Sequence, residues 1–129
     1  MQAGDTLETQ QYDVTRADLV AYAEASGDHN PIHQDEAVAT AVGLPGVIAH
    51  GMFTLALAAR AVATWTGGAE VVELGAKFTN PVLVPADGAA AVTVAGTVKS
   101  VADGLATIAL EVTCDGQKVL GMPKAVVRA

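Results

Sequence analysis

Cysteine is almost absent from this chain, because Cys114 is the only one among its 129 residues. A single cysteine excludes an internal disulfide and a metal site built from several cysteines. We interpret Cys114 as a half-buried strand residue rather than a nucleophile. The sequence also shows no glycine-rich phosphate loop, no GxSxG serine elbow and no Cys/His pair. None of those classes of site is therefore indicated.

Basic residues are scarce as well, with 7 Lys and Arg against 14 Asp and Glu and a net charge of -7. No cluster of Lys or Arg offsets this charge, and an acidic surface repels nucleic acid and anionic membranes. We therefore expect no nucleic-acid partner and no membrane partner. The first residues contain no basic region followed by an apolar run, so we expect no secretory signal and a cytoplasmic location.

The longest helix-prone stretch, residues 51–66, is too short for a membrane span, which needs about 20 apolar residues. It carries one charge, Arg60, and is apolar or small on almost every side. As a helix it would be about 24 Å long, and Gly67 could end it with a left-handed turn. A surface helix normally has a polar face. This stretch therefore predicts a buried central helix with protein on most sides and a sheet wrapped round it.

The chain before this helix is more polar. We expect residues 1–13 to form a short edge strand or an arm. Thr15 and Asp18 resemble a capping box, which predicts a helix over residues 15–26 that ends at Gly27. Asn30 as N-cap with proline at the next position then predicts a second short helix over residues 31–42.

The chain after the central helix has the pattern of antiparallel strands. Four strands are expected, over residues 70–79, 89–101, 105–114 and 117–128. The Asp-Gly pairs at 103–104 and 115–116 are typical of hairpin turns. Gly96 indicates a bulge, and Pro123 indicates an edge strand. Helices followed by a run of strands predict an α+β fold, and we expect residues 1–129 to form one domain.

Asp28 and His33 belong to the densest polar cluster of the chain, in a turn shaped by Pro31. A carboxylate and an imidazole that face one cavity can hold a water molecule and move its protons, which is the minimum for adding or removing water. From spacing alone, the commoner alternative is a structural turn in which Asp28 bonds backbone amides. A metal site is a weaker alternative, because one Asp and one His are too few ligands and no second histidine is well spaced.

His50 and Gly51 stand at the start of the expected central helix. The first amides of a helix lack an internal partner and carry the positive end of its dipole. Gly51 would let a substrate carbonyl approach its amide, which could polarise a thioester; glycine required only for packing is the alternative. We interpret His50 as a capping or packing residue rather than a second base, and substrate contact is a further role for it. His29 is expected to be an exposed loop residue that could touch a ligand.

Three segments resemble the landmarks of the MaoC-like (R)-specific enoyl hydratases. Residues 22–33 read YAEASGDHNPIH, residues 48–52 read IAHGM and residues 77–82 read KFTNPV, in the order that this family shows. More narrowly, the chain resembles the catalytic subunit of actinobacterial (3R)-hydroxyacyl-ACP dehydratases. The resemblance implies the hot-dog fold, in which a curved antiparallel sheet wraps a long central helix.

The resemblance also implies roles for individual residues. Asp28 and His33 would be the catalytic pair, Asn30 would shape their turn, and the Gly51 amide would bind the thioester carbonyl. The implied reaction is the reversible hydration of trans-2-enoyl thioesters of CoA or acyl-carrier protein to (R)-3-hydroxyacyl thioesters. We expect no cofactor and no metal.

Three alternatives are weighed against a self-sufficient hydratase. A hot-dog thioesterase would need a carboxylate on or near the central helix, and residues 51–66 contain none. A non-catalytic acyl-binding subunit would have no chemical need for both Asp28 and His33. A catalytic chain could also depend on a paralogous partner. An open sheet edge favours pairing across a two-fold axis, so we expect a homodimer or a heterodimer.

Overall fold

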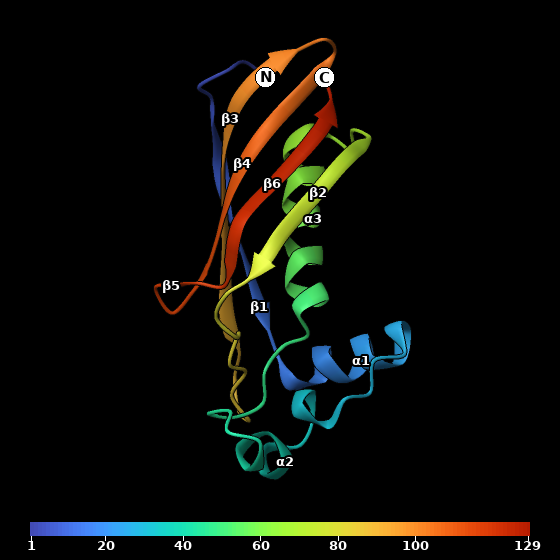
Figure 1. The fold of residues 1–129 in the computed structure, drawn as a ribbon, viewed down its shortest axis with the longest axis vertical. Helices are drawn as coiled ribbons and strands as arrows, with labels where there is room; N and C mark the ends of the chain where they lie inside the picture. The colour runs from blue at the N-terminus through green and yellow to red at the C-terminus, as the bar shows by residue number, and fades with distance from the viewer.

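The computed structural model describes residues 1–129 and places one long helix against a curved antiparallel sheet (Figure 1). The strands are β1 (Thr6–Val14), β2 (Val71–Phe78), β3 (Ala90–Ala102), β4 (Leu105–Cys114), β5 (Gln117–Lys118) and β6 (Leu120–Arg128). The helices are α1 (Arg16–Ser26), the 3-10 turn η1 (Pro31–His33), α2 (Glu36–Ala41) and α3 (Gly51–Thr66). The predicted α+β arrangement, with a central helix and a sheet that curves round it, is confirmed.

The strand order in the sheet is β1-β3-β4-β6-β2, with the short β5 paired to β4. The expected edge position of Pro123 is therefore wrong, because β6 lies between β4 and β2. Its pairing with β4 ends at Lys124, and its register with β2 shifts between Gly75 and Lys77. Pro123 lies in this irregular stretch, where its missing N–H breaks no regular ladder. The free edges are β2 and β1, and the edge position of β1 was expected.

Gly96 is not a bulge in its own strand, which corrects the prediction. The register of β3 with β4 shifts between Val98 and Ser100 instead. A Cβ atom on Gly96 would lie 2.8 Å from the Trp65 ring. The indole Nε1 donates a hydrogen bond of 2.6 Å to the Glu8 carbonyl. Gly96 thus provides the space in which the end of α3 packs on the sheet.

The two predicted hairpins and the first helix form as expected. Asp103 and Asp115 have positive φ angles, as residues of such turns do. The Thr15 hydroxyl accepts a bond from the Asp18 amide, and the Asp18 carboxylate accepts one from the Thr15 amide. Gly27 ends α1 in the left-handed conformation.

The expected helix over residues 31–42 is interrupted. Asn30 caps a single turn, η1, and the chain then becomes extended at Asp35, where φ is -119° and ψ is 112°. The Asp35 side chain accepts a bond from the Val38 amide and so starts α2. Asp35 is therefore the N-cap of α2, because its short carboxylate satisfies an otherwise unpaired amide.

The hydrophobic core lies between α3 and the concave face of the sheet. Alternate residues of β3 and β4 point into it, and Ala58, Ala61 and Val62 of α3 meet them. Cys114 is buried in this cluster. Burial, and then the Asp115 carboxylate, raise the pKa of the Cys114 thiol, which disfavours the reactive thiolate. This agrees with a structural strand cysteine.

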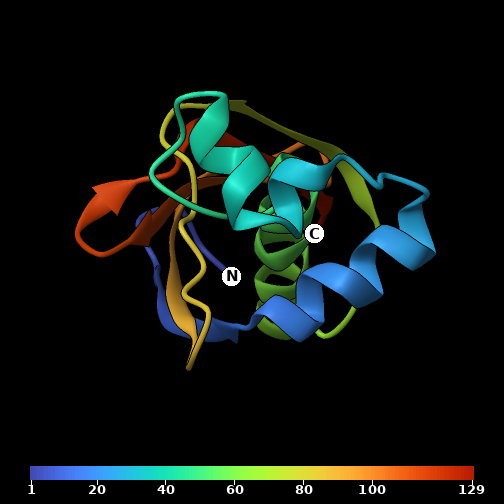
Figure 2. The same ribbon diagram turned by 90° about the horizontal axis from the view of Figure 1, so that it is seen from below.

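The expectation of protein on most sides of α3 is only partly met. Seen along its axis, α3 is enclosed by the sheet over part of its circumference (Figure 2). Met52, Ala56 and Ala63 are exposed on it, and Val72 and Phe78 of β2 are exposed beside it. The sheet ends at β2, so one apolar stripe of the helix stays uncovered. None of the helices combines the length and apolar character that a membrane span requires.

Candidate active site

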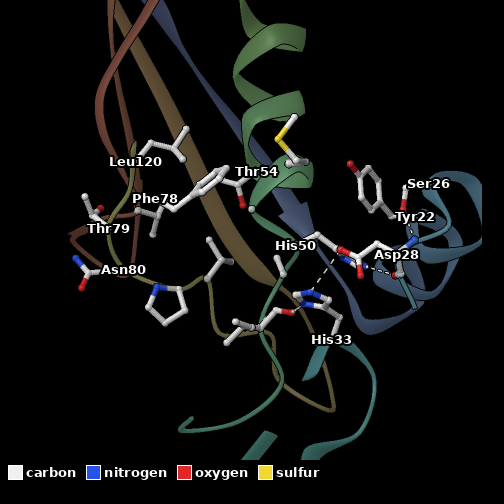
Figure 3. Close-up of a pocket in the computed structure, with 17 residues that line it drawn as sticks. Tyr22, Ser26, Asp28, His33, His50, Thr54, Phe78, Thr79, Asn80 and Leu120 are labelled. Carbon is white, nitrogen blue, oxygen red and sulfur yellow. Dashed lines mark hydrogen bonds and ion pairs between the residues drawn. The ribbon is translucent and has the colours of Figure 1, made fainter. Parts of the chain in front are cut away.

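A cavity of about 540 Å³ lies at the N-terminal end of α3. Asp28, His33 and His50 form one side of it, and Phe78, Thr79 and Asn80, which follow one another at and beyond the end of β2, form the other (Figure 3). Its remaining wall comes from α1, the segment 48–49, α3, the segment 81–82 and residues 119–120. The two sides are far apart in sequence, and the packing of β2 beside α3 brings them together.

The turn before η1 fixes the position of Asp28. Its Oδ1 atom accepts a bond of 3.2 Å from the Asn30 amide. The Asn30 Oδ1 atom accepts a bond of 3.2 Å from the Ile32 amide, which places Asn30 at the N-cap as predicted. Such side-chain bonds two residues onward stabilise a turn locally. The Asp28 carboxylate makes this bond and still faces the cavity with half of its side chain exposed.

His33 is buried and held in one orientation. Its Nδ1 atom lies 2.7 Å from the Ile48 carbonyl oxygen. A carbonyl only accepts hydrogen bonds, so Nδ1 carries a proton, and in the neutral imidazole Nε2 then presents a lone pair. That Nε2 atom lies 4.0 Å from the Asp28 Oδ2 atom. The structure therefore brings the two predicted residues together on one cavity, with a proton acceptor facing a carboxylate.

His50 joins this pair, which the sequence reasoning missed. Its side chain makes no capping bond and is 1% exposed. Its Nε2 atom donates to the Asp28 backbone carbonyl at 3.1 Å, and its ring stacks on His33 at 3.9 Å. The burial of His50 agrees with the packing interpretation, and the capping alternative is wrong because the side chain makes no capping bond. The prediction that no second histidine is well spaced for a metal site is also wrong. The contact joins segments 22 residues apart, so no local sequence pattern predicts it.

Two physical consequences follow for His50. Burial is the largest cause that lowers its pKa, and the bond to the Asp28 carbonyl opposes it. The Nδ1 atom is buried without a hydrogen-bond partner, which costs about 1–3 kcal/mol. The unpaired Nδ1 atom thus opposes folding, whereas the bond to Asp28 and the stacking on His33 favour the observed position of His50.

Asp28, His33 and His50 also form a group whose potential metal-ligand atoms lie within 4.8 Å of one another. The number of potential ligands therefore no longer argues against a metal site. However, the two rings stack with an interplanar angle of 23°. Lone pairs lie in the ring planes, so stacked rings direct them side by side rather than toward one ion at about 2.0 Å. The absence of a metal from the site stays a prediction.

Gly51 is the first residue of α3, and its amide donates no hydrogen bond within the chain. A Cβ atom at this position would lie 2.9 Å from the Phe78 ring. Glycine is therefore required for packing at this position, and Gly51 also lines the cavity. His29 is exposed, as expected, and does not line the cavity.

The long helix on a curved antiparallel sheet, with a polar site at the start of that helix, defines a hot-dog protein. A family model described as "MaoC like domain" matches residues 1–116. The chain belongs to this MaoC-like family.

Several relatives extend this result. A solved structure described as a MaoC-like dehydratase has a TM-score of 0.95 at 36% identity, covering 99% of this chain and 40% of that one. An R-hydratase from Pseudomonas aeruginosa has a TM-score of 0.86 at 26% identity, covering 99% and 82%. The 3-hydroxyacyl-thioester dehydratase X of Mycobacterium tuberculosis is 43% identical over 74 residues, which are 57% of this chain. The match spans only 25% of that relative's length.

Proposed function

We propose that this chain catalyses the reversible syn addition of water to a trans-2-enoyl thioester, which gives the (R)-3-hydroxyacyl thioester. One observation carries this proposal: the free Nε2 atom of His33 faces the Asp28 carboxylate across 4.0 Å at the wall of a cavity. The similarity to an R-hydratase and to a thioester dehydratase supports the same reaction class.

A gap of 4.0 Å allows one water molecule to contact both groups, since each hydrogen bond is about 2.8 Å long. His33 Nε2 would accept one proton of this water, and Asp28 would accept a hydrogen bond from the other. The water oxygen would then form a bond to C3 of the substrate as the electron pair of the double bond moves toward the thioester. The proton taken from this water is then passed to C2 by His33 or Asp28, which returns both groups to their starting state. Because both groups lie on one wall of the cavity, it arrives from the side of the added oxygen, and the addition is syn.

The Gly51 amide would stabilise the charge that develops on the thioester oxygen. It is unpaired within the chain and lies at the positive end of the α3 dipole. One donor of this kind typically contributes about 10²–10³ in rate. The apolar cavity walls, including Phe78 and Leu120, would hold the start of the acyl chain.

The experiment is hydration of crotonyl-CoA and of a longer trans-2-enoyl-CoA, followed by the loss of the enoyl thioester absorbance. General acid–base catalysis typically contributes 10²–10⁴ in rate, so we expect Asp28→Asn and His33→Ala to lose about that factor. His29→Asn is the matched control, since its exposed ring does not line the cavity. Near-normal turnover in folded Asp28→Asn or His33→Ala would overturn the assignment.

The alternatives predict different results in the same assay. A hot-dog thioesterase would release free thiol from a saturated acyl-CoA, but Asp28 is the only carboxylate on the cavity wall and α3 carries none. A non-catalytic acyl-binding subunit would be inactive alone, and its complex with a catalytic partner would keep its turnover in the Asp28→Asn variant. A partner-dependent dehydratase would be inactive alone and become active with acyl-carrier-protein substrates and a paralogous second subunit.

We propose further that the chain forms a homodimer, or a heterodimer with such a subunit, through β2. This strand has one free edge, and exposed Met52, Val72 and Phe78 lie beside it. Apolar surface next to an unpaired edge favours association. Light scattering should give about twice the 13.0 kDa mass of the chain, and Val72→Lys should lower it. A chain that stays monomeric alone and does not bind a paralogous subunit would contradict the proposal.

The remaining proposals concern the whole chain. We infer that residues 1–129 form one domain, supported by the single cluster of 23 buried hydrophobic residues; limited proteolysis should give no stable smaller fragment. We infer that the reaction needs neither cofactor nor metal, so that dialysis against a chelator leaves turnover unchanged. A cytoplasmic location stays a prediction that cell fractionation tests.

A further inference from the structure

His50 contacts both members of the proposed catalytic pair and lies with them on the same wall of the cavity. Its Nε2–H group bonds the backbone carbonyl of Asp28 at 3.1 Å. The centroid of its ring lies 3.9 Å from the centroid of the His33 ring, with an interplanar angle of 23°. One buried side chain thus joins the Asp28 turn, η1 and the start of α3.

The surroundings of His50 permit only one protonation state without conflict. Nε2 must carry a proton, because its partner is a carbonyl oxygen, and Nδ1 is buried without any partner. The titratable groups against it are His33 from η1, Asp28 from the preceding turn and Tyr22 from α1, whose ring lies 4.8 Å away. A second proton on His50 would put a buried cation beside the group that has to accept a proton.

We propose that His50 is a positioning residue that stays neutral and holds Asp28 and His33 at their working separation. This inference rests on the proposed hydration reaction. The bond to the Asp28 carbonyl fixes the backbone of Asp28, and with it the distance of its carboxylate from His33. The stacked ring prevents His33 from turning about its bond to Ile48, so that Nε2 keeps facing Asp28. Because His50 stays neutral, His33 alone takes the proton from water.

Two substitutions test separately the hydrogen bond of His50 to Asp28 and its stacking on His33. His50→Phe keeps a ring to stack on His33 but has no donor for the Asp28 carbonyl. His50→Gln keeps an N–H donor but has no ring. A displacement near 1 Å in a catalytic group costs about 10²-fold in rate, so we expect each variant to lose about 10- to 100-fold in kcat with little change in KM.

A merely structural role for His50 is distinguished by a control in the core. Ile108 is fully buried in β4 and does not line the cavity. Ile108→Val should lower the melting temperature while folded enzyme keeps its kcat. If His50→Phe and His50→Gln behave like Ile108→Val, with reduced Tm and unchanged kcat, the positioning role is wrong.

A measurement without substrate tests the protonation state. The chain has 3 histidines, so ¹⁵N labelling of histidine gives three ring systems that single variants assign. Long-range ¹H–¹⁵N spectra should show His50 as the Nε2–H tautomer and His33 as the Nδ1–H tautomer. We expect the His50 ring to titrate below about pH 6.5, where an ordinary imidazole is half protonated.

The kinetic assay and the NMR spectra together separate a failure of the hydration reaction from a failure of the positioning role of His50. If the wild-type chain shows no turnover alone or with a partner, the hydration reaction fails, and the spectra still decide the state of His50. If the wild type turns over and both His50 variants keep its kcat, only the positioning role fails. A His50 ring that titrates near pH 6.5, or that carries its proton on Nδ1, overturns the inference directly.

Discussion

The Phe78 ring occupies the space in which a side chain of Gly51 would lie, 2.9 Å from the position of a Cβ atom. The start of α3 and the end of β2, two segments of the cavity wall, are therefore in direct contact. They can approach this closely because Gly51 has no side chain. This contact allows the packing role and the proposed catalytic role of Gly51 to be separated by experiment.

Gly51→Ala should lower kcat/KM by at least about tenfold, because the added methyl group must displace Phe78 or the helix start. Overpacking of this kind typically costs about 1–3 kcal/mol of stability. The double variant Gly51→Ala with Phe78→Ala removes the clash, and its urea midpoint should recover relative to Gly51→Ala alone. If kcat stays low in the double variant relative to Phe78→Ala alone, access to the amide matters in itself. Recovery of both quantities would leave Gly51 with a packing role only.

Asn30→Ala should weaken the turn that presents Asp28, because the Ile32 amide loses its acceptor. Loss of an N-cap acceptor costs about 0.5–2 kcal/mol, and we expect kcat to fall with it. Asn30→Asp keeps an acceptor oxygen at the same distance along the side chain and serves as the matched control. Steady-state kinetics and urea denaturation of both variants test this. Equal kcat in the two variants would show that the Asn30 acceptor is not needed.

Gly96→Ala should destabilise the protein by about 1–3 kcal/mol, because its Cβ atom would lie 2.8 Å from the Trp65 ring. Trp65 is the only tryptophan in the chain, so its fluorescence reports this contact without interference. We expect a shifted emission maximum in the native state together with a lower denaturation midpoint. Gly75→Ala is the control, since a Cβ atom there would meet nothing within 4 Å. The same midpoint in both variants would contradict the packing described.

His50 should make the fold less stable in acid. Its pKa in the folded protein is lowered below the usual 6.5, mainly by burial. Below about pH 6.5 the unfolded chain therefore binds a proton that the folded chain does not. The free energy of unfolding is highest above that pH and falls as the pH decreases, by up to about 1.4 kcal/mol per unit from this group.

Urea denaturation at about pH 8 and about pH 5 measures this effect. The wild type should lose more stability between the two values than His50→Gln does, because both retain every other titrating group. An equal loss in the two proteins would mean that His50 does not remain neutral in the fold.

The sequence by itself determined the features that depend on near neighbours. The capping box of Thr15 and Asp18, the Asn30 cap and the Asp-Gly hairpins each need only a few consecutive residues, and all of them form. Asp28 and His33 meet for the same reason, since one short turn separates them. The apolar character of residues 51–66 likewise predicted a central helix, because its composition left no polar face.

Only the tertiary structure decided the contacts between distant segments. His50 meets the Asp28 carbonyl across 22 residues of sequence, and Phe78 fills the space beside Gly51 because β2 packs next to α3. The interior position of β6 depends on which strands pair, and local pattern does not encode that choice. The exposed stripe of α3 likewise depends on where the sheet ends. Burial and pairing are properties of the whole fold, so the surroundings that lower the His50 pKa arise only when these segments come together.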